Sequence, residues 1–209
     1  MQDRVPTLDL FSMLWLMIES PAQAFRKIIL SEHKNYVLVI GLFLGIAASF
    51  ILMWVKQSGN SFDNLFPAMA FGTLIGVLLS IPLTMILTLC IHYVAILVGG
   101  KGTFKESYGV VGWSFIPMIF LVVIVLPLQL AALGLFAFSS NPSAYQVKPV
   151  VTVVLLGLEG LLIVWSLVLL GIGISMVHRF AVLKSIIMVT IVTGMVGYGI
   201  FLIYSSFNI

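Results

Sequence analysis

The stretch Glu106-Ser-Tyr-Gly-Val-Val-Gly-Trp-Ser-Phe-Ile-Pro117 joins a short polar loop, residues 99–107, to a long apolar run that continues to Phe138. Two of its side chains, Tyr108 and Trp113, carry amphipathic rings of the kind that settle at a membrane–water interface. The stretch is therefore typical of the point where a helix enters a membrane.

The glycines and the proline of this stretch predict how the helix packs and bends. Gly109 and Gly112 are three residues apart, so on a helix they share a face and allow another backbone to approach closely. Pro117 has no backbone N–H and is expected to kink the helix about one turn after Trp113. We therefore expect a bent helix that packs closely against a neighbour.

The composition of the whole chain places it in a membrane. Of its 209 residues 61% are hydrophobic and 8% charged, and the mean hydropathy is +1.22. A soluble domain has about 25% charged residues, so that class is excluded. The net charge is +3, but the basic residues are scattered and form no patch, so we expect no nucleic-acid partner.

Hydropathy predicts an all-α fold, a polytopic membrane helix bundle with five transmembrane helices. The predicted spans are residues 36–55, 67–98, 108–138, 147–177 and 185–204. The second and third are longer than a ~30 Å hydrocarbon core requires, and we expect Pro82 to kink the second. The third contains Pro117 and Pro127 without a polar turn between them, which favours one bent helix over a hairpin of two half-spans.

Residues 1–35 are expected to form amphipathic helices that lie on the membrane surface, ahead of a transmembrane domain of residues 36–209. The apolar run Leu8–Ile18 is too short to cross, and its apolar side chains share one helical face. Pro21 is typical of the first position of a second helix, in which Phe25 and Ile28 face one way. The alternative is that Leu8–Ile18 packs under the bundle as a re-entrant segment.

The distribution of lysine and arginine predicts the orientation. One side of the five-span arrangement has eight basic residues and the other has two. The eight are Arg4, Arg26, Lys27, Lys34, Lys101, Lys105, Arg179 and Lys184, and the two are Lys56 and Lys148. Because positive loops stay inside, we expect a cytoplasmic N-terminus and an external C-terminus.

Small residues recur at helical spacing in four spans and predict close helix packing. The strongest series are Gly41, Gly45 and Ser49 in the first span and Gly72, Gly76 and Ser80 in the second; weaker ones are Gly157 with Gly160 and Thr193 with Gly197. We interpret them as packing within the bundle and not as a dedicated dimer interface.

Three polar residues inside spans are candidates for function: Glu159, Gln129 and His92. A carboxylate in the fourth span needs a partner, a water cavity or a proton. Gln129 lies at a similar depth in the third span, so a structural Glu159–Gln129 hydrogen bond is one interpretation. A role in handling ions, protons or lipid headgroups is the other.

Neither a metal site nor an enzyme is expected. His92, Cys90 and His178 have no recognised metal-ligand spacing, and His178 fits a positively charged end of the fourth span. The chain lacks His-Glu-x-x-His, Gly-x-Ser-x-Gly and phosphate-binding glycine loops. No catalytic residue or cofactor is predicted.

The order of residues in the opening stretch resembles the signature of the Yip1 family, which is roughly Asp-Leu-Tyr-Gly, then Gly-Tyr, then Pro. Four residues match and three stand in for others: Tyr108, Gly109, Gly112 and Pro117 match, while Glu106 replaces Asp, Ser107 replaces Leu and Trp113 replaces Tyr. The resemblance implies five spans and a role in membrane trafficking or membrane organisation through protein or lipid contacts.

The resemblance also suggests partners. Eukaryotic relatives contact small GTPases of the Rab type through a longer hydrophilic N-terminus, and the short, mostly apolar segment here speaks against such binding. We expect membrane lipids and other membrane proteins as partners, in a homo- or hetero-oligomer, and a prokaryotic member in the cell membrane. The alternative function is a small transporter or channel component that uses Glu159, Gln129 and the prolines.

Overall fold

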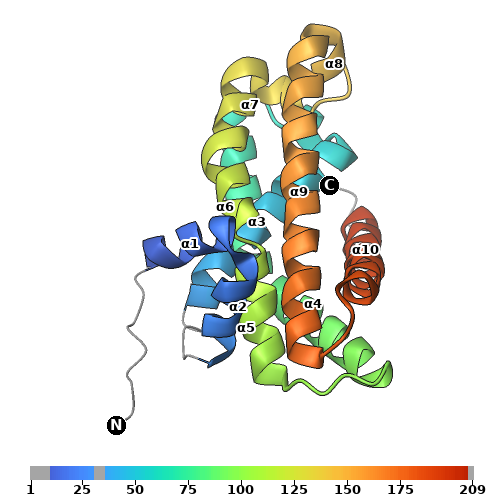
Figure 1. Ribbon diagram of the computed structural model, residues 1–209. Helices are drawn as coiled ribbons and strands as arrows, with labels where there is room; N and C mark the ends of the chain where they lie inside the picture. Colours follow the sequence, from blue (N-terminus) through green and yellow to red (C-terminus); the bar gives the residue numbers. More distant parts are fainter. Residues whose placement is uncertain (1–9, 31–35, 207–209) are drawn as a thin grey trace.

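The computed structural model describes residues 10–30 and 36–206, and this part of the chain is a bundle of helices with only an isolated bridge between Ser140 and Ser143. Figure 1 shows long helices packed side by side, with two short helices at one flank. The bounds are α1 Leu10–Glu19, α2 Pro21–Leu30, α3 Val37–Lys56, α4 Leu65–Leu97, α5 Phe104–Ser114, α6 Pro117–Phe120, α7 Leu126–Leu133, α8 Ala144–Val147, α9 Pro149–His178 and α10 Val182–Ser206.

Five segments are long and apolar enough to cross a membrane, as predicted. They are Val37–Lys56, Leu65–Leu97, Phe104–Phe138, Pro149–His178 and Val182–Ser206. Successive spans run in opposite directions, which gives the bundle two ends. We call the end with residues 98–108 and 178–182 the motif end, and the end with residues 56–64 and 139–148 the far end (Figure 1).

The third span is bent, as predicted, and the structure shows where it bends. Helix α5 ends at Ser114, and the N–H groups of Phe115 and Ile116 bond to the carbonyls of Gly112 and Trp113 at 3.2 and 3.3 Å. Pro117 begins α6 because the missing N–H costs nothing in a first helical turn. A π-helical segment, residues 121–125, then joins α6 to α7.

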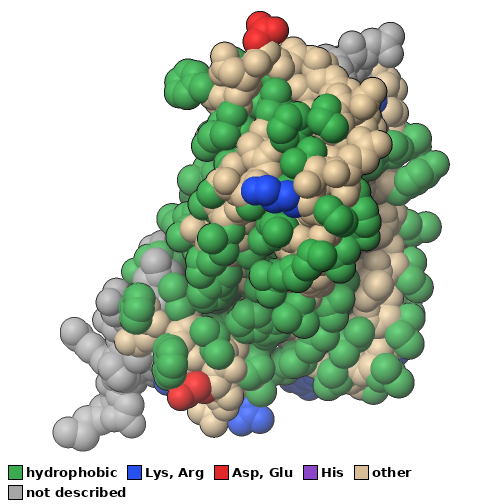
Figure 2. All heavy atoms as spheres, turned by 90° about the horizontal axis from the view of Figure 1, so that it is seen from above, with side chains coloured by type: hydrophobic (Ala, Val, Ile, Leu, Met, Phe, Trp, Pro, Cys, Tyr) green, Lys and Arg blue, Asp and Glu red, His purple; other side chains and the backbone are tan. Residues whose placement is uncertain are grey.

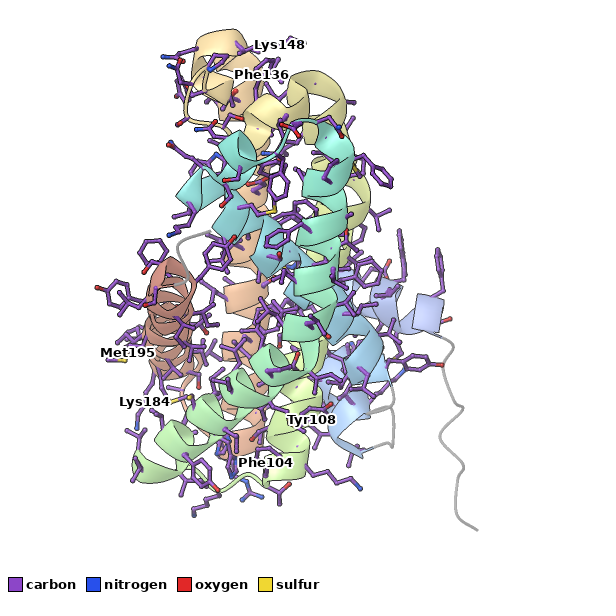
Figure 3. All side chains as sticks on the ribbon, turned by 180° about the vertical axis from the view of Figure 1, so that it is seen from behind. Phe104, Tyr108, Phe136, Lys148, Lys184 and Met195 are labelled. Carbon is purple, nitrogen blue, oxygen red and sulfur yellow. The ribbon has the colours of Figure 1, made fainter. Side chains whose placement is uncertain are left out.

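The second span also changes direction. Helix α4 contains Pro82 in its interior, and Figure 3 shows its ribbon turning partway along. Two hydroxyls near the proline bond back to helix carbonyls, Ser80 Oγ to Val77 O at 2.7 Å and Thr84 Oγ1 to Ser80 O at 2.8 Å. These bonds satisfy polar side chains inside the spanning helix.

Glycines bring α3 and α4 into backbone contact, as their spacing predicts. A Cβ added at Gly45 would lie 2.6 Å from Ser80 Cα, and one at Gly76 would lie 2.5 Å from Ile46 Cα. Gly41 and Gly72 are equally crowded, against Thr84 and Phe50 at 2.8 Å. These four glycines therefore form the contact between the first two spans.

The predicted packing role of the glycines in the last two spans is wrong. A Cβ added at Gly157, Gly160, Gly194 or Gly197 would meet no atom within 4 Å. These positions face open space on α9 and α10, which pack less completely than the other spans: only 17% of the most apolar stretch of α10 is buried. Small residues alone do not distinguish a packed face from an open one.

The N-terminal helices pack on the bundle through one face each. In α1, Met13 and Met17 are fully buried, while Phe11 and Trp15 are 77% and 59% exposed. In α2, Phe25 and Ile28 share one face, as predicted, and this face is buried where the helix contacts α5 and α9. The exposed apolar face of α1 points away from the bundle, which suits a helix between protein and lipid. Leu8 lies outside the described residues.

The far end is closed by contacts between two loops. Asn60 follows α3 and Ser140 precedes α8, and the Ser140 N–H donates to Asn60 Oδ1 at 3.2 Å while Asn60 Nδ2 donates to Ser140 Oγ. Lys148 at the start of α9 donates to the Ala132 carbonyl at 2.9 Å. Figure 3 shows Lys148 and Phe136 at this end and Phe104 and Tyr108 at the other.

Candidate functional site

The motif end begins with a capped helix. The Glu106 N–H donates to Thr103 Oγ1 at 3.3 Å, and the Thr103 N–H donates to Glu106 Oε2 at 2.8 Å. This reciprocal pair is a capping box, which satisfies two backbone donors at the start of α5. Glu106, which stands where the Yip1 signature has Asp, therefore helps to fix the start of the third span.

The remaining signature residues pack inside the protein. A Cβ at Gly112 would overlap the side chain of Val37, so α5 and α3 are in contact at Gly112, where a close helix approach was predicted. Gly109 and Pro117 are buried, and Tyr108 is half-buried. Trp113 is fully buried and meets Tyr36 edge to face at 6.0 Å between ring centroids.

The expectation that Trp113 sits in an interfacial ring of aromatics is therefore wrong. Its indole is covered by protein, because the glycine one position earlier brings α3 close enough to enclose it. Tyr108 retains partial exposure and lies near Phe104 at the motif end (Figure 3).

Three buried polar side chains from three spans meet next to this motif. Ser107 Oγ lies 3.0 Å from His92 Nδ1 and 3.0 Å from His178 Nε2. The exposed fractions are 0% for Ser107, 8% for His92 and 1% for His178, and the two imidazole rings are 5.4 Å apart. We call this group the His–Ser–His cluster.

The hydrogen bonds of the cluster define which nitrogen of His178 carries a proton. The Gly102 N–H donates to His178 Nδ1 at 3.3 Å, so Nδ1 is an acceptor and the proton lies on Nε2, which donates to Ser107 Oγ. The ring can approach the loop because Gly100 has no Cβ, which would overlap His178 Nδ1. Gly99, at φ +94°, turns the chain into this loop.

Aromatic rings and a lysine surround the cluster. Phe104 meets His92 edge to face at 5.6 Å, and Phe180 stacks on His178 at 6.0 Å. Lys184 Nζ lies 4.6 Å from the Phe180 ring centroid and donates to the Val98 carbonyl at 3.3 Å. The cluster thus ties the ends of α4 and α9 to the start of α5.

Sequence reasoning named His92 but missed its partners. Ser107 occupies the position where the signature has Leu, and that departure was the available signal. His178 was considered with His92 and Cys90 as a metal site and was then interpreted as a helix end, although its ring is buried. In the described part of the chain, no three His, Cys, Asp or Glu side chains are grouped as metal ligands, and Cys90 does not join the two histidines in such a group.

The predicted hydrogen bond between Glu159 and Gln129 does not form. Gln129 is buried, with 4% of its surface exposed, and Glu159 is half-buried on α9. Across residues 10–30 and 36–206, no hydrogen bond or ion pair of Glu159 is found. Similar depth along two neighbouring helices does not place two side chains face to face.

Glu159 lies nearer the far end of α9 than the motif end. It lies 19 residues from His178, or ~28 Å along α9. It lies 10 residues, or ~15 Å, from Pro149 at the other end of the helix. Figure 1 shows the far end of α9, with α8, extending past the end of α10.

These features define a polytopic helical membrane protein whose third span opens with a capped, glycine-containing motif. Comparison with known protein families matches residues 15–204 to the Yip1 domain. The chain therefore belongs to the Yip1 domain family, and the match takes in all five spans. Neither the curated proteins nor the solved structures gave a significant match.

Proposed function

We propose that this Yip1-family protein is not an enzyme and organises or sorts membrane components through contacts with lipids or with other membrane proteins. The observation that carries the proposal is Glu159, a half-buried carboxyl in a spanning helix with no partner among the described residues. Such a group is costly in a membrane unless something pairs with it. In this proposal the partner is a lipid headgroup or a donor on another membrane protein.

The surroundings of Glu159 suit an external partner. Gly160 beside it is exposed and has open space around it. Gly157, on another face of α9, is also exposed and open. Figure 2, seen from above, shows few charged side chains among the hydrophobic ones on that face of the molecule. A half-buried carboxyl next to an exposed glycine is accessible to a lipid headgroup or to a donor on another helix.

A photo-crosslinking side chain at Gly160 tests the proposal in native membranes. We expect a specific adduct, of lipid or of a second protein, that decreases strongly in the Glu159→Leu background. The matched control is the same side chain at Gly157, which has the same open surroundings but lies about 200° around the helix from Glu159. Equal labelling at both positions, unaffected by Glu159→Leu, would contradict the proposal.

One observation favours the alternative of a small transporter or channel component. The third span is interrupted by the turn at Phe115 and Ile116 and by the π-helical segment, and broken helices are used in transporters. Liposomes that contain the purified protein distinguish the two functions. Ion or proton flux that disappears in Glu159→Gln, together with no Glu159-dependent adduct, would favour the transporter.

A further inference from the structure

An apolar groove opens between α3, α9 and α10. Its volume is about 620 Å³, within the range of ~300–1,000 Å³ that ligand sites usually have. Its walls include Val55 on α3, Ile163 on α9 and Phe201 on α10. Gly194 and Gly197 line it without filling it, since a Cβ at either would meet nothing within 4 Å.

Three polar side chains follow these walls at the far end of the groove. Lys56 comes directly after Val55, and Tyr204 lies one turn beyond Phe201. Because α9 runs in the opposite direction, the residue one turn beyond Ile163 toward the far end is Glu159. By their positions along the three helices, a cation, a hydroxyl and a carboxyl therefore lie just beyond the lining residues Val55, Phe201 and Ile163, toward the far end.

The cation and the hydroxyl lie together, and the hydroxyl has no hydrogen-bond partner among the described residues. Lys56 Nζ lies 5.8 Å from the centroid of the Tyr204 ring, and Tyr204 OH is buried without a hydrogen-bond partner. The other lysine of the far end, Lys148, is already bonded to the Ala132 carbonyl. A buried hydroxyl beside an ammonium group is suited to a phosphate oxygen.

We infer that the groove binds a phospholipid with an amino headgroup, of the phosphatidylethanolamine class. One acyl chain occupies the apolar groove, the phosphate contacts Lys56 and Tyr204, and the headgroup ammonium lies toward Glu159. Charges of both signs at the mouth match a zwitterionic headgroup, whereas a purely anionic one would face the Glu159 carboxylate. This inference rests on the proposed function, because it supplies the external partner of Glu159.

Native mass spectrometry of the purified protein, mixed with phosphatidylethanolamine, phosphatidylglycerol or phosphatidylcholine of identical chains, tests the assignment. We expect one phosphatidylethanolamine to be retained several-fold better than the other two. Lys56→Gln and Tyr204→Phe should weaken retention of all three lipids. Glu159→Gln should remove the preference for the amino headgroup over phosphatidylglycerol.

Filling the groove tests the acyl-chain site separately. Gly197→Leu adds a side chain to open space, so the protein should still fold, but lipid retention should fall several-fold. The controls are Gly157→Leu, an open glycine that does not line the groove, and Lys148→Gln, the other far-end lysine; both should retain lipid as the wild type does. Melting temperature and gel filtration confirm folding of each variant.

Three results would overturn the inference. Phosphatidylglycerol retained as well as phosphatidylethanolamine would contradict the headgroup assignment, and lipid retention by Gly197→Leu equal to that of the wild type would contradict the groove as the site. Absence of retained lipid, with a second polypeptide crosslinked in the groove, would identify a protein contact instead. In that case the Glu159-dependent adduct at Gly160 would persist, so the lipid inference would fail while the proposed function would stand.

Discussion

Ser107 shows how one residue changes what a family motif does. A leucine at this position could only pack, whereas the serine hydroxyl lies within 3.0 Å of a nitrogen of both His92 and His178. Its oxygen also lies 3.1 Å from the Thr103 carbonyl. One hydroxyl therefore connects the two buried imidazoles.

Replacing this serine should destabilise the protein. Ser107→Ala leaves a nitrogen of each histidine unpaired, and stranding a buried polar group costs ~1–3 kcal/mol. We expect a lower melting temperature in detergent. The matched control is Ser114→Ala in the same helix, because the Ser114 hydroxyl only bonds back to the Val110 carbonyl at 2.7 Å. Equal melting temperatures for the two variants would show that the cluster contributes nothing.

A second prediction at this scale concerns Glu159. Since no bond to Gln129 forms, Glu159→Leu should leave the stability unchanged or raise it, because a carboxyl without a partner is replaced by an apolar side chain. The double-mutant cycle of Glu159→Leu and Gln129→Leu should show coupling near zero. Coupling of about 0.6 kcal/mol, the average for such bonds in membranes, would show that Glu159 and Gln129 do interact.

The residues of the candidate site were only partly predictable, for a geometric reason. Single polar residues inside apolar spans stand out in a sequence, so Glu159, Gln129 and His92 were found. Which of them meet depends on helix rotation and on loop closure, neither of which a hydropathy pattern contains. The His–Ser–His cluster forms because Gly100 and Gly102 let the loop press against His178 and Val177.

At the scale of elements, glycine spacing predicted packing in one pair of spans and failed in another. The α3–α4 contact is crowded at all four glycines, while Gly157 and Gly160 of α9 and Gly194 and Gly197 of α10 face open space. The pattern of small residues is similar in both cases. What differs is whether a neighbouring helix lies on that face, which depends on the order of the spans around the bundle.

This difference gives opposite expectations for the same substitution. Gly45→Ala places a methyl group against the Ser80 backbone at 2.6 Å, and such overpacking typically costs ~1–3 kcal/mol. Gly157→Ala enters open space in a helix interior, where alanine is favoured over glycine by ~0.5–1 kcal/mol. Thermal unfolding in detergent should therefore move in opposite directions. A stable Gly45→Ala would mean that α3 and α4 can separate at little cost.

The N-terminal helices pack on the bundle through one face each and leave the other face exposed. Met13, Met17 and Phe25 are fully buried, so α1 and α2 pack on the bundle. Phe11 and Trp15 remain exposed on the other face of α1. The face that the sequence analysis singled out carries Phe11 and Trp15 and points outward, whereas the buried Met13 and Met17 lie on the opposite side of α1.

At the scale of the whole molecule, the five spans were predictable because length and hydropathy alone define them. The position of the break in the third span was not, since Pro117 indicates a kink but the turn at residues 115–116 and the π-helical segment depend on packing. The structure also shows which residues lie at the same end of the bundle. Figure 3 shows Lys184 near the motif end and Lys148 at the far end.

The orientation of the bundle in the membrane is the last prediction. The described basic residues of the motif end include Lys101, Lys105, Arg179 and Lys184, whereas Lys56 and Lys148 lie at the far end. Because short loops rich in lysine and arginine stay in the cytoplasm, the motif end should be cytoplasmic. With five spans, Ser206 then lies on the opposite side from Val37.

Reporter fusions measure this directly. A reporter that is active only in the cytoplasm should be active when fused after Lys101, because two spans return the chain to the motif end. It should be silent after Asn141, in the far-end loop, and after Ile209. An inverted pattern would contradict the positive-inside assignment, and activity after both Lys101 and Ile209 would contradict five spans. The expected pattern would place Lys56, Tyr204 and Glu159 at the external boundary, so the groove would draw its phospholipid from the outer leaflet.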